Sequence, residues 1–385
     1  MADGGERPAT AEAEPWAGRR VVLVHDWLTG MRGGEKVLEA ICRLLPHAEL
    51  VTLLHTPGSV SPVIASRRIR TSFIQRLPLA SRWYRHYLPL FPIAVESLDL
   101  DDADLIISTS HAAVKSVVPT GRARHLCYCH SPMRYAWDQF DAYFGVERVG
   151  PLAHAALRRV LAWLARWDRA TAGRVDHFLA NSRYVAGRIA RYYNRHASVL
   201  YPPVDTAFFT PGGGPPEPYF LVVSALVPYK RIDVAIQAAS RLGVRLKVAG
   251  TGPDAARLQA VSGPAVEFLG SVEGEALRAL YRRAQALVLP AEEDFGIAPV
   301  EAMACGRPVV AFARGGATET VEPGVTGWLV DAQTPDAFAD AMQAAAAATW
   351  DPARLVERAA AFAPDRFASG FRQAVNEMLS SPRSC

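Results

Sequence analysis

Short apolar runs rich in valine, leucine and isoleucine alternate along the chain with longer stretches of helical periodicity. Helical patterns cover about 35–45 and 152–172 in the first half. The apolar runs between them predict buried strands at 20–24, 50–54, 105–108, 125–129 and 177–180. Strands that are apolar at nearly every position and separated by helices are typical of a parallel sheet covered on both faces.

The alternation pauses at residues 202–218, the stretch richest in proline and glycine, which we interpret as an interdomain linker. A second series of strands is predicted at 219–223, 245–249, 266–269, 286–289 and 308–311, and 337–379 is mostly helical. The pattern predicts an α/β protein of two Rossmann-like, doubly wound domains, each binding ligands at the carboxyl ends of its strands. We expect an N-terminal domain at 19–201, a C-terminal domain at 219–362, and a helix at 363–385 that returns to the N-terminal domain.

Composition narrows the class of protein. The chain has 385 residues, half of them apolar, which is enough for two cores. A net charge of +4 is mild and argues against general nucleic-acid binding. Residues 1–18 have no apolar core region and predict a disordered tail, not a signal peptide. Five irregularly spaced cysteines favour reduced thiols, and no apolar run reaches the ~18 residues of a membrane span, so we expect a cytoplasmic protein.

The strongest candidate chemistry lies in the loop 293–301, between a predicted strand and a helix expected to start near Pro299. A helix N-terminus suits a diphosphate, and Gly296 lets the backbone approach a ligand closely. Glu301 can accept hydrogen bonds from a ribose diol, although a capping carboxylate is the plain alternative. Glu293 can hold sugar hydroxyls.

Other polar residues also follow predicted strands. Lys230 is placed to supply charge to a diphosphate leaving group, unless it and Arg231 are surface charges on a helix. Gly33 and Gly34 open a helix and offer N–H groups to phosphate. His130 ends a strand before a polar cluster, which indicates an active-site rim, although a lone histidine is often structural.

Weaker candidates complete the first half. Asp26, Arg134 and Tyr135 are expected to shape an acceptor site, and His111 has the same placement as His130 after a strand. Ser182 is interpreted as a helix N-cap. Four aspartates resemble an Asp-x-Asp metal pattern but precede a strand, where carboxylates are ordinarily solvated, so we expect no metal: Asp99, Asp101, Asp102 and Asp104.

The segment 293–310, with Gly315-Gly316, Glu319 and the run 324–330, resembles the Glu-x7-Glu region of glycosyltransferase family 4. That resemblance covers about residues 20–375 and implies a retaining transferase of the GT-B fold. It implies that 19–201 is the acceptor domain and 219–362 the nucleotide-sugar donor domain. It also implies that Glu301 binds the nucleotide ribose and that His130 lies beside the donor sugar. It assigns the donor site to Gly33, Gly34, Ser224, Lys230, Arg231, Gly250, Gly252, Phe268, Leu269, Glu293, Phe295, Gly296, Ile297, Ala298 and Glu301. The family often has an arginine where this chain has Ala225, so Arg231 or a basic residue of the first half would have to substitute.

Three segments, 26–36, 130–138 and 224–231, look most like the bacterial mannosyltransferase branch of O-antigen and exopolysaccharide synthesis. This implies GDP-mannose as co-substrate, a glycan or polyprenyl-diphosphate-linked saccharide as acceptor, and no further cofactor. No convincing nucleophile is visible, so front-face attack is favoured over a covalent intermediate. A nucleotide-sugar 2-epimerase and a non-catalytic sugar-binding protein are the rival functions.

The segment 67–91 mixes arginines, aromatic residues and leucines. Basic amphipathic segments of this kind bind anionic lipid surfaces, and a lipid-linked acceptor favours such contact with the inner membrane. The alternative is a solvated segment that packs its aromatic side chains inward.

Overall fold

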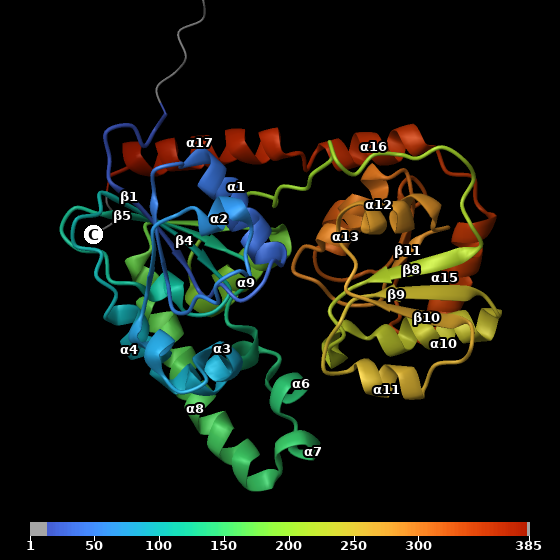
Figure 1. Ribbon diagram of the computed structural model, residues 1–385, viewed down its shortest axis with the longest axis horizontal. Coiled ribbons are helices and arrows are strands. Elements are labelled where there is room, and N and C mark those ends of the chain that lie inside the picture. The colour runs from blue at the N-terminus through green and yellow to red at the C-terminus, as the bar shows by residue number, and fades with distance from the viewer. Residues whose placement is uncertain (1–13, 383–385) are drawn as a thin grey trace, which may run out of the picture.

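The computed structural model describes residues 14–382 and contains two parallel sheets (Figure 1). The N-terminal sheet has seven strands in the order β3-β2-β1-β4-β5-β6-β7. Its strands are β1 (Val21–His25), β2 (Glu49–Thr52), β3 (Ile69–Thr71), β4 (Leu105–Ser110), β5 (Arg124–Cys129), β6 (His177–Ala180) and β7 (Ala197–Val199). The α-helices of this part are α1 (Gly33–Leu44), α2 (Pro62–Ala65), α3 (Ala80–Trp83), α4 (Phe91–Glu96), α5 (Arg134–Trp137), α6 (Phe140–Phe144), α7 (Val146–Val149), α8 (Pro151–Ala170) and α9 (Arg183–Tyr193).

The C-terminal sheet has six strands in the order β10-β9-β8-β11-β12-β13. These strands are β8 (Tyr219–Val223), β9 (Arg245–Ala249), β10 (Val266–Gly270), β11 (Leu287–Leu289), β12 (Val309–Phe312) and β13 (Gly327–Val330). The α-helices that follow β8 are α10 (Ile232–Leu242), α11 (Ala255–Ala260), α12 (Gly274–Arg283), α13 (Ile297–Ala304), α14 (Ala317–Thr320), α15 (Pro335–Ala347), α16 (Pro352–Ala360) and α17 (Pro364–Ser380).

Both sheets reverse their strand order at the strand that opens the domain. β1 lies between β2 and β4, and β8 lies between β9 and β11. In open α/β sheets such a switch point, at the carboxyl ends of the strands, is where ligands bind. The loops after β1 and β8 lie at these points, so the topology confirms the predicted pair of doubly wound α/β domains.

Alternating side chains of β1 build the two cores of the N-terminal domain. Val22 and Val24 pack in one cluster with residues of α4, and Leu23 packs in another with residues of α1 and α17. All five residues of β1 are buried. A strand buried on both faces needs an apolar side chain at almost every position, which explains why its sequence lacks polar alternation.

The C-terminal helix lies against the N-terminal domain. Phe367 and Phe371 of α17 belong to the same core cluster as Leu23, and α17 runs beside α1 in Figure 1. Trp16 is buried with its ring 6.1 Å from that of Phe371, and Glu14 pairs with Arg372. Residues 14–18, expected as part of a disordered tail, therefore pack on α17, and residues 1–13 lie outside the described part of the chain.

Three strands escaped the sequence analysis: β3, β7 and β13. Each lies at a sheet edge and has only three or four residues. An edge strand buries little of its surface, so its sequence carries no long apolar run. The described cysteines, Cys42, Cys127, Cys129 and Cys305, are free and buried. No helix in residues 14–382 is long and apolar enough to cross a membrane.

Candidate functional site

The first turns of α1 and α13 meet across the two domains. A Cβ atom built on Gly33 would lie 3.2 Å from Cδ1 of Ile297, the first residue of α13. Gly296 precedes this helix with a φ of +85°, a conformation that favours glycine. The first N–H groups of a helix have no partner inside it and carry partial positive charge. Two such helix starts in contact make a place suited to an anion.

Glu301 lies directly beside this contact and is almost completely buried. Its Oε2 accepts a hydrogen bond from the Tyr281 hydroxyl at 2.8 Å, and its Oε1 accepts one from Lys36 Nζ of α1 at 2.8 Å. The helix begins at Ile297, two residues before the expected start, so Glu301 lies in its second turn. The carboxylate therefore does not cap α13, and the capping alternative is wrong.

Lys230 and Glu293 form an ion pair on the C-terminal side of the site. Their side chains are only 13% and 12% exposed, so Lys230 is not a solvated surface charge. Arg231 donates instead to Gln333 at 2.9 Å and lies 3.3 Å from Asp233. Arg231 thus supports the loop after β8, and the structure does not bring it to Glu293.

Several predicted donor-site residues have packing roles in the structure. A Cβ on Gly250 would lie 1.8 Å from the Ser224 carbonyl oxygen, and one on Gly252 would lie 2.2 Å from that of Leu226. These glycines let the loops after β8 and β9 touch. Phe268 and Leu269 are half-buried on the edge strand β10, the Phe295 ring packs against Tyr201 and Phe362, and Ala298 lies half-buried in the first turn of α13.

His130 ends β5 and faces the start of α1. A Cβ on Gly34 would lie 3.6 Å from its Nε2, which is buried without a hydrogen-bond partner among the described residues. Burial, together with the neighbouring rings of His111 and His25, lowers the pKa of His130 to about 3. The imidazole is therefore neutral at pH 7, and its Nε2 points to the part of the site that Gly34 leaves open.

A carboxylate of the C-terminal domain is held by two arginines of the N-terminal domain. Asp294 pairs with Arg134, whose Nε lies 3.0 Å from Oδ2, and with Arg188, whose Nη1 lies 3.1 Å from Oδ1. Arg188 also donates to Asp138 at 2.9 Å. Although burial opposes it, the charge of Asp294 raises the pKa of Arg134. Arg134, predicted as an acceptor-site residue, thus joins the domains, and no local pattern in the sequence pointed to Arg188.

Asp26 is completely buried. Its two carboxylate oxygens accept hydrogen bonds at 2.7 to 3.0 Å from the four consecutive backbone N–H groups of residues 111–114. Burial alone would raise its pKa, but His111 and these N–H groups hold the pKa of Asp26 below its ordinary value. Asp26 therefore has a structural role in the loop after β4, and its predicted acceptor role stays a prediction. Tyr135 is half-buried, and its hydroxyl has no partner among the described residues.

The start of α9 is also closed by the opposite domain. Ser182 accepts a hydrogen bond from the Val185 N–H at 3.0 Å, which confirms the predicted N-cap. Glu319 accepts from the N–H groups of Arg183 and Tyr184 at 2.8 and 2.9 Å. The carboxylate faces the positive end of the helix and so links α9 to the C-terminal domain.

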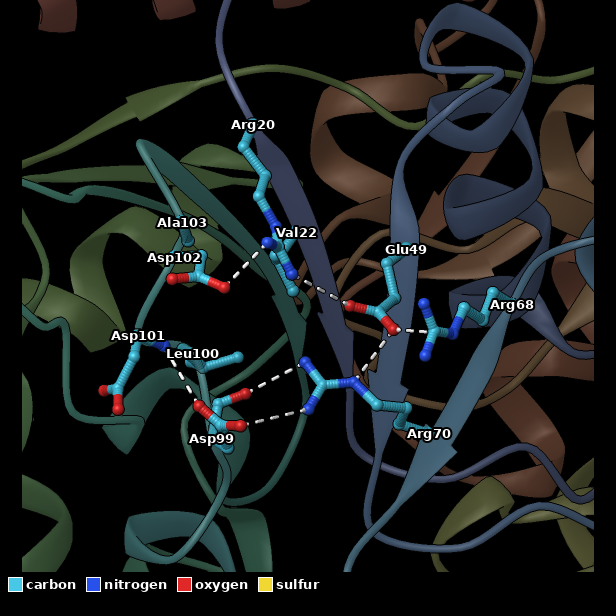
Figure 2. Close-up of a pocket in the computed structure, with 10 residues that line it drawn as sticks. All are labelled: Arg20, Val22, Glu49, Arg68, Arg70, Asp99, Leu100, Asp101, Asp102 and Ala103. Carbon is cyan, nitrogen blue, oxygen red and sulfur yellow. Dashed lines mark hydrogen bonds and ion pairs between the residues drawn. The ribbon is translucent and has the colours of Figure 1, made fainter.

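The aspartate run 99–104 lies at the amino ends of β1, β2 and β4, where it lines a surface hollow (Figure 2). Asp102 pairs with Arg20 at 2.8 Å, and Arg70 pairs with both Asp99 and Glu49. Asp99 and Asp102 pair with arginines while their side chains stay 73% and 75% exposed, as expected for solvated carboxylates. Within residues 14–382, no group of three or more His, Cys, Asp or Glu side chains is arranged to hold a metal ion.

Two protein-family models match this chain, one over each half. Residues 31–208 match the family model described as Glycosyltransferase Family 4, and residues 217–347 match the model Glycosyl transferases group 1. Both models describe glycosyltransferases. The Family 4 model covers β2 to β7, the group 1 model covers β8 to β13, and the boundary between them falls just before β8.

Curated relatives of this chain carry the name D-inositol 3-phosphate glycosyltransferase. The protein of Salinispora arenicola is 32% identical over 251 residues, which are 54% of this chain and 56% of the relative. That of Geodermatophilus obscurus is 36% identical over 202 residues, 44% of this chain and 45% of the relative. The chain thus spans about half the length of these relatives.

Solved structures share the fold over nearly the whole chain. Sucrose-phosphate synthase from Thermosynechococcus elongatus is 20% identical with a TM-score of 0.68, and the match covers 94% of this chain and all of that one. Anabaena HepE, solved in complex with UDP and glucose, is 19% identical with a TM-score of 0.66 and the same coverage. These likenesses establish the two-domain GT-B fold.

Proposed function

We propose that this glycosyltransferase moves a hexose from a nucleoside diphosphate sugar to a hydroxyl group of an acceptor, with retention at the anomeric carbon. The observation that carries the proposal is the contact between the starts of α1 and α13, flanked by Glu301 and by the Lys230–Glu293 pair. Such a site offers N–H groups for two phosphates and carboxylates for ribose and sugar hydroxyls.

The chemistry follows from these positions. The bond between the anomeric carbon and the diphosphate oxygen breaks, while Lys230 and the two helix starts stabilise the departing charge. The acceptor oxygen bonds to the same carbon from the same face, and its proton passes to the leaving phosphate oxygen. Glu293 holds sugar hydroxyls, and the neutral His130 lies beside the sugar. A covalent intermediate would need a free nucleophile, and Glu293 is paired with Lys230.

For the donor we propose GDP-mannose, supported by the resemblance of segments 26–36, 130–138 and 224–231 to mannosyltransferases of surface polysaccharide synthesis. The acceptor is then a glycan or polyprenyl-diphosphate-linked saccharide. The names of the relatives favour inositol phosphate as a second acceptor to test, and the HepE complex favours a UDP-sugar as a second donor.

A donor panel tests the class and the donor together. Thermal shift with GDP-mannose, GDP-glucose, UDP-glucose and UDP-GlcNAc should show stabilisation by one base only, because a ligand that binds the native state raises the melting temperature. Turnover should require an acceptor. Turnover to free sugar or to an epimer without acceptor would support the epimerase, and binding with no turnover on any acceptor would support a sugar-binding protein.

Glu293→Gln tests the site. We expect kcat to fall on the order of 10²-fold, because the neutral amide loses the charged hydrogen bonds to the sugar, while affinity for the nucleoside diphosphate is retained. Glu357→Gln, at an exposed position of α16, is the matched control and should behave like the native protein. Native kcat in the Glu293 variant would contradict this assignment.

We also propose that the segment 67–91 contacts an anionic membrane surface. Ile74, Tyr84 and Phe91 point into the core, but Leu79 and Trp83 are 56% and 47% exposed. The exposed arginines of the same stretch are Arg68, Arg76, Arg82 and Arg85. Exposed apolar side chains among cations suit a surface of anionic lipid headgroups.

Vesicle sedimentation tests this contact. Binding to phosphatidylglycerol vesicles should exceed binding to phosphatidylcholine vesicles, because the arginines attract anionic headgroups. Leu79→Ser with Trp83→Ser should weaken binding at least about tenfold, since two buried apolar contacts are lost. The control Val261→Ser removes a side chain of similar exposure in the C-terminal domain and should leave binding unchanged. Equal binding by both variants would rule out this surface.

A further inference from the structure

The loop that starts α13 carries an excess of negative charge. Three acidic residues lie in it, Glu292, Glu293 and Asp294, and Glu301 follows in the second turn of α13. Among the described residues of the C-terminal domain, only Lys230 forms an ion pair with this loop. A diphosphate placed at α13 would therefore meet repulsion from this domain alone, and the further positive charge must come from the N-terminal domain.

The N-terminal domain supplies three cations to this loop and to Glu301, and their side chains differ in how far they are exposed to solvent. The Arg134 and Arg188 side chains are only 17% and 6% exposed, and Asp294, which both of them contact, is 10% exposed. The Lys36 side chain is 45% exposed, and its contact with Glu301 is a single hydrogen bond of 2.8 Å. An ammonium group has three donors on a flexible stem, so Lys36 can change partner while its own charge stays in contact with solvent.

We propose that Lys36 is a donor-binding residue that exchanges Glu301 for the diphosphate when the nucleotide binds. This inference rests on the proposed function. The ribose diol takes the Glu301 oxygen that Lys36 leaves, and the freed ammonium binds the phosphates between the starts of α1 and α13. Gly33 faces Ile297, and Lys36 lies only three residues after Gly33 in α1. A small rotation of the Lys36 side chain therefore keeps its Nζ near the starts of both helices.

The exchange predicts opposite effects on two ligands. A nucleoside without phosphates breaks the Lys36–Glu301 pair and gains nothing from the ammonium. A nucleoside diphosphate breaks the same pair and gains a charge-assisted contact. Removing the ammonium therefore frees Glu301 for ribose and weakens only the phosphate contact. A lysine that merely held the domains together would lower the affinity for both ligands alike.

Isothermal titration separates these cases. Native protein, Lys36→Gln and Lys36→Arg are titrated with guanosine, GDP, uridine and UDP. For the base that binds, Lys36→Gln should weaken the diphosphate about tenfold or more and leave the nucleoside unchanged or tighter, and Lys36→Arg should retain most of the affinity. Arg43→Gln, which removes an exposed cation from the same helix, is the control and should match the native protein.

Equal losses for nucleoside and diphosphate, or no loss for either, would overturn the role of Lys36. If native protein binds a diphosphate and transfers sugar while Lys36→Gln binds it equally well, only this inference fails. If native protein binds neither GDP nor UDP, the proposed function fails with it.

Discussion

Two histidines of lowered pKa, His125 in β5 and His130 directly after it, make the stability of the molecule depend on pH. His125 is fully buried, with Nε2 2.8 Å from Ser108 Oγ and Nδ1 3.2 Å from the Arg174 carbonyl oxygen. Burial lowers the pKa of His125 to about 4, and that of His130 to about 3. In the unfolded chain a histidine takes up its proton near pH 6.5. Between these values only the unfolded state is protonated, so stability falls as the pH falls.

His125→Gln should flatten this dependence. Each such histidine contributes a slope of about 1.4 kcal/mol per pH unit in this range, and the variant lacks one of them. Urea unfolding at several values between pH 4.5 and 6 measures the slope of the free energy of unfolding. The slope is the readout because the substitution also lowers stability at every pH. An unchanged slope would mean that His125 is protonated in the folded protein.

Single residues could be placed from the sequence where they follow a strand directly. Lys230, Glu293 and Glu301 were found in this way, and the structure places each of them next to the contact between α1 and α13 or in the loop beside it. Asp26 follows a strand too, but it turns inward to bind backbone N–H groups. Arg188 lies in the middle of α9, and its partner Asp294 lies 106 residues away in the chain, so no local pattern could join them.

At the scale of elements, the loops after β8 and β9 depend on close backbone contact. Gly250→Ala would place a methyl group 1.8 Å from the Ser224 carbonyl oxygen, at a φ of +145°. We expect a loss of about 3 kcal/mol or more in the free energy of unfolding, because backbone cannot yield as a side chain can. Nucleotide binding should weaken as well, since Ser224 lies in the loop after β8 that leads to Lys230.

The matched control is Gly263→Ala, where a Cβ would meet nothing within 4 Å. Urea unfolding and thermal shift with the preferred nucleotide compare the two variants. Similar stability of both would show that the two loops separate more easily than their contact indicates.

The central strands were predictable and the edges were not. β1 is buried at every position and reads as one apolar run, whereas β7 mixes buried and exposed residues over only three positions. The start of α13 was misplaced by two residues because Pro299 was taken as the first helical residue, and the structure places it third. The sequence thus located the loop that faces the ligand but misjudged which turn Glu301 occupies.

At the scale of the whole molecule, charged contacts join the domains around the site. Lys36 pairs with Glu301, two arginines pair with Asp294, and Glu319 closes the start of α9. One aromatic contact adds to them, with the Tyr143 and Tyr229 rings stacked at 5.6 Å. Because these partners come from different domains, the arrangement of the domains should respond to single charge changes.

Asp294→Asn tests this response. The neutral amide leaves Arg134 and Arg188 without their shared charge partner, and loss of one member of a buried pair costs on the order of 3 kcal/mol. We expect the domains to separate, with a larger radius of gyration in small-angle X-ray scattering and a higher KM for the donor. Saturating nucleoside diphosphate should restore the native radius, because the ligand binds both helix starts at once. Asp340→Asn, at an exposed position of α15, should scatter like the native protein. If Asp294→Asn keeps the native radius of gyration without nucleotide, the ion pairs of Asp294 with the two arginines are not needed to hold the domains together. Other interdomain contacts, such as that between Gly33 and Ile297, would then be sufficient.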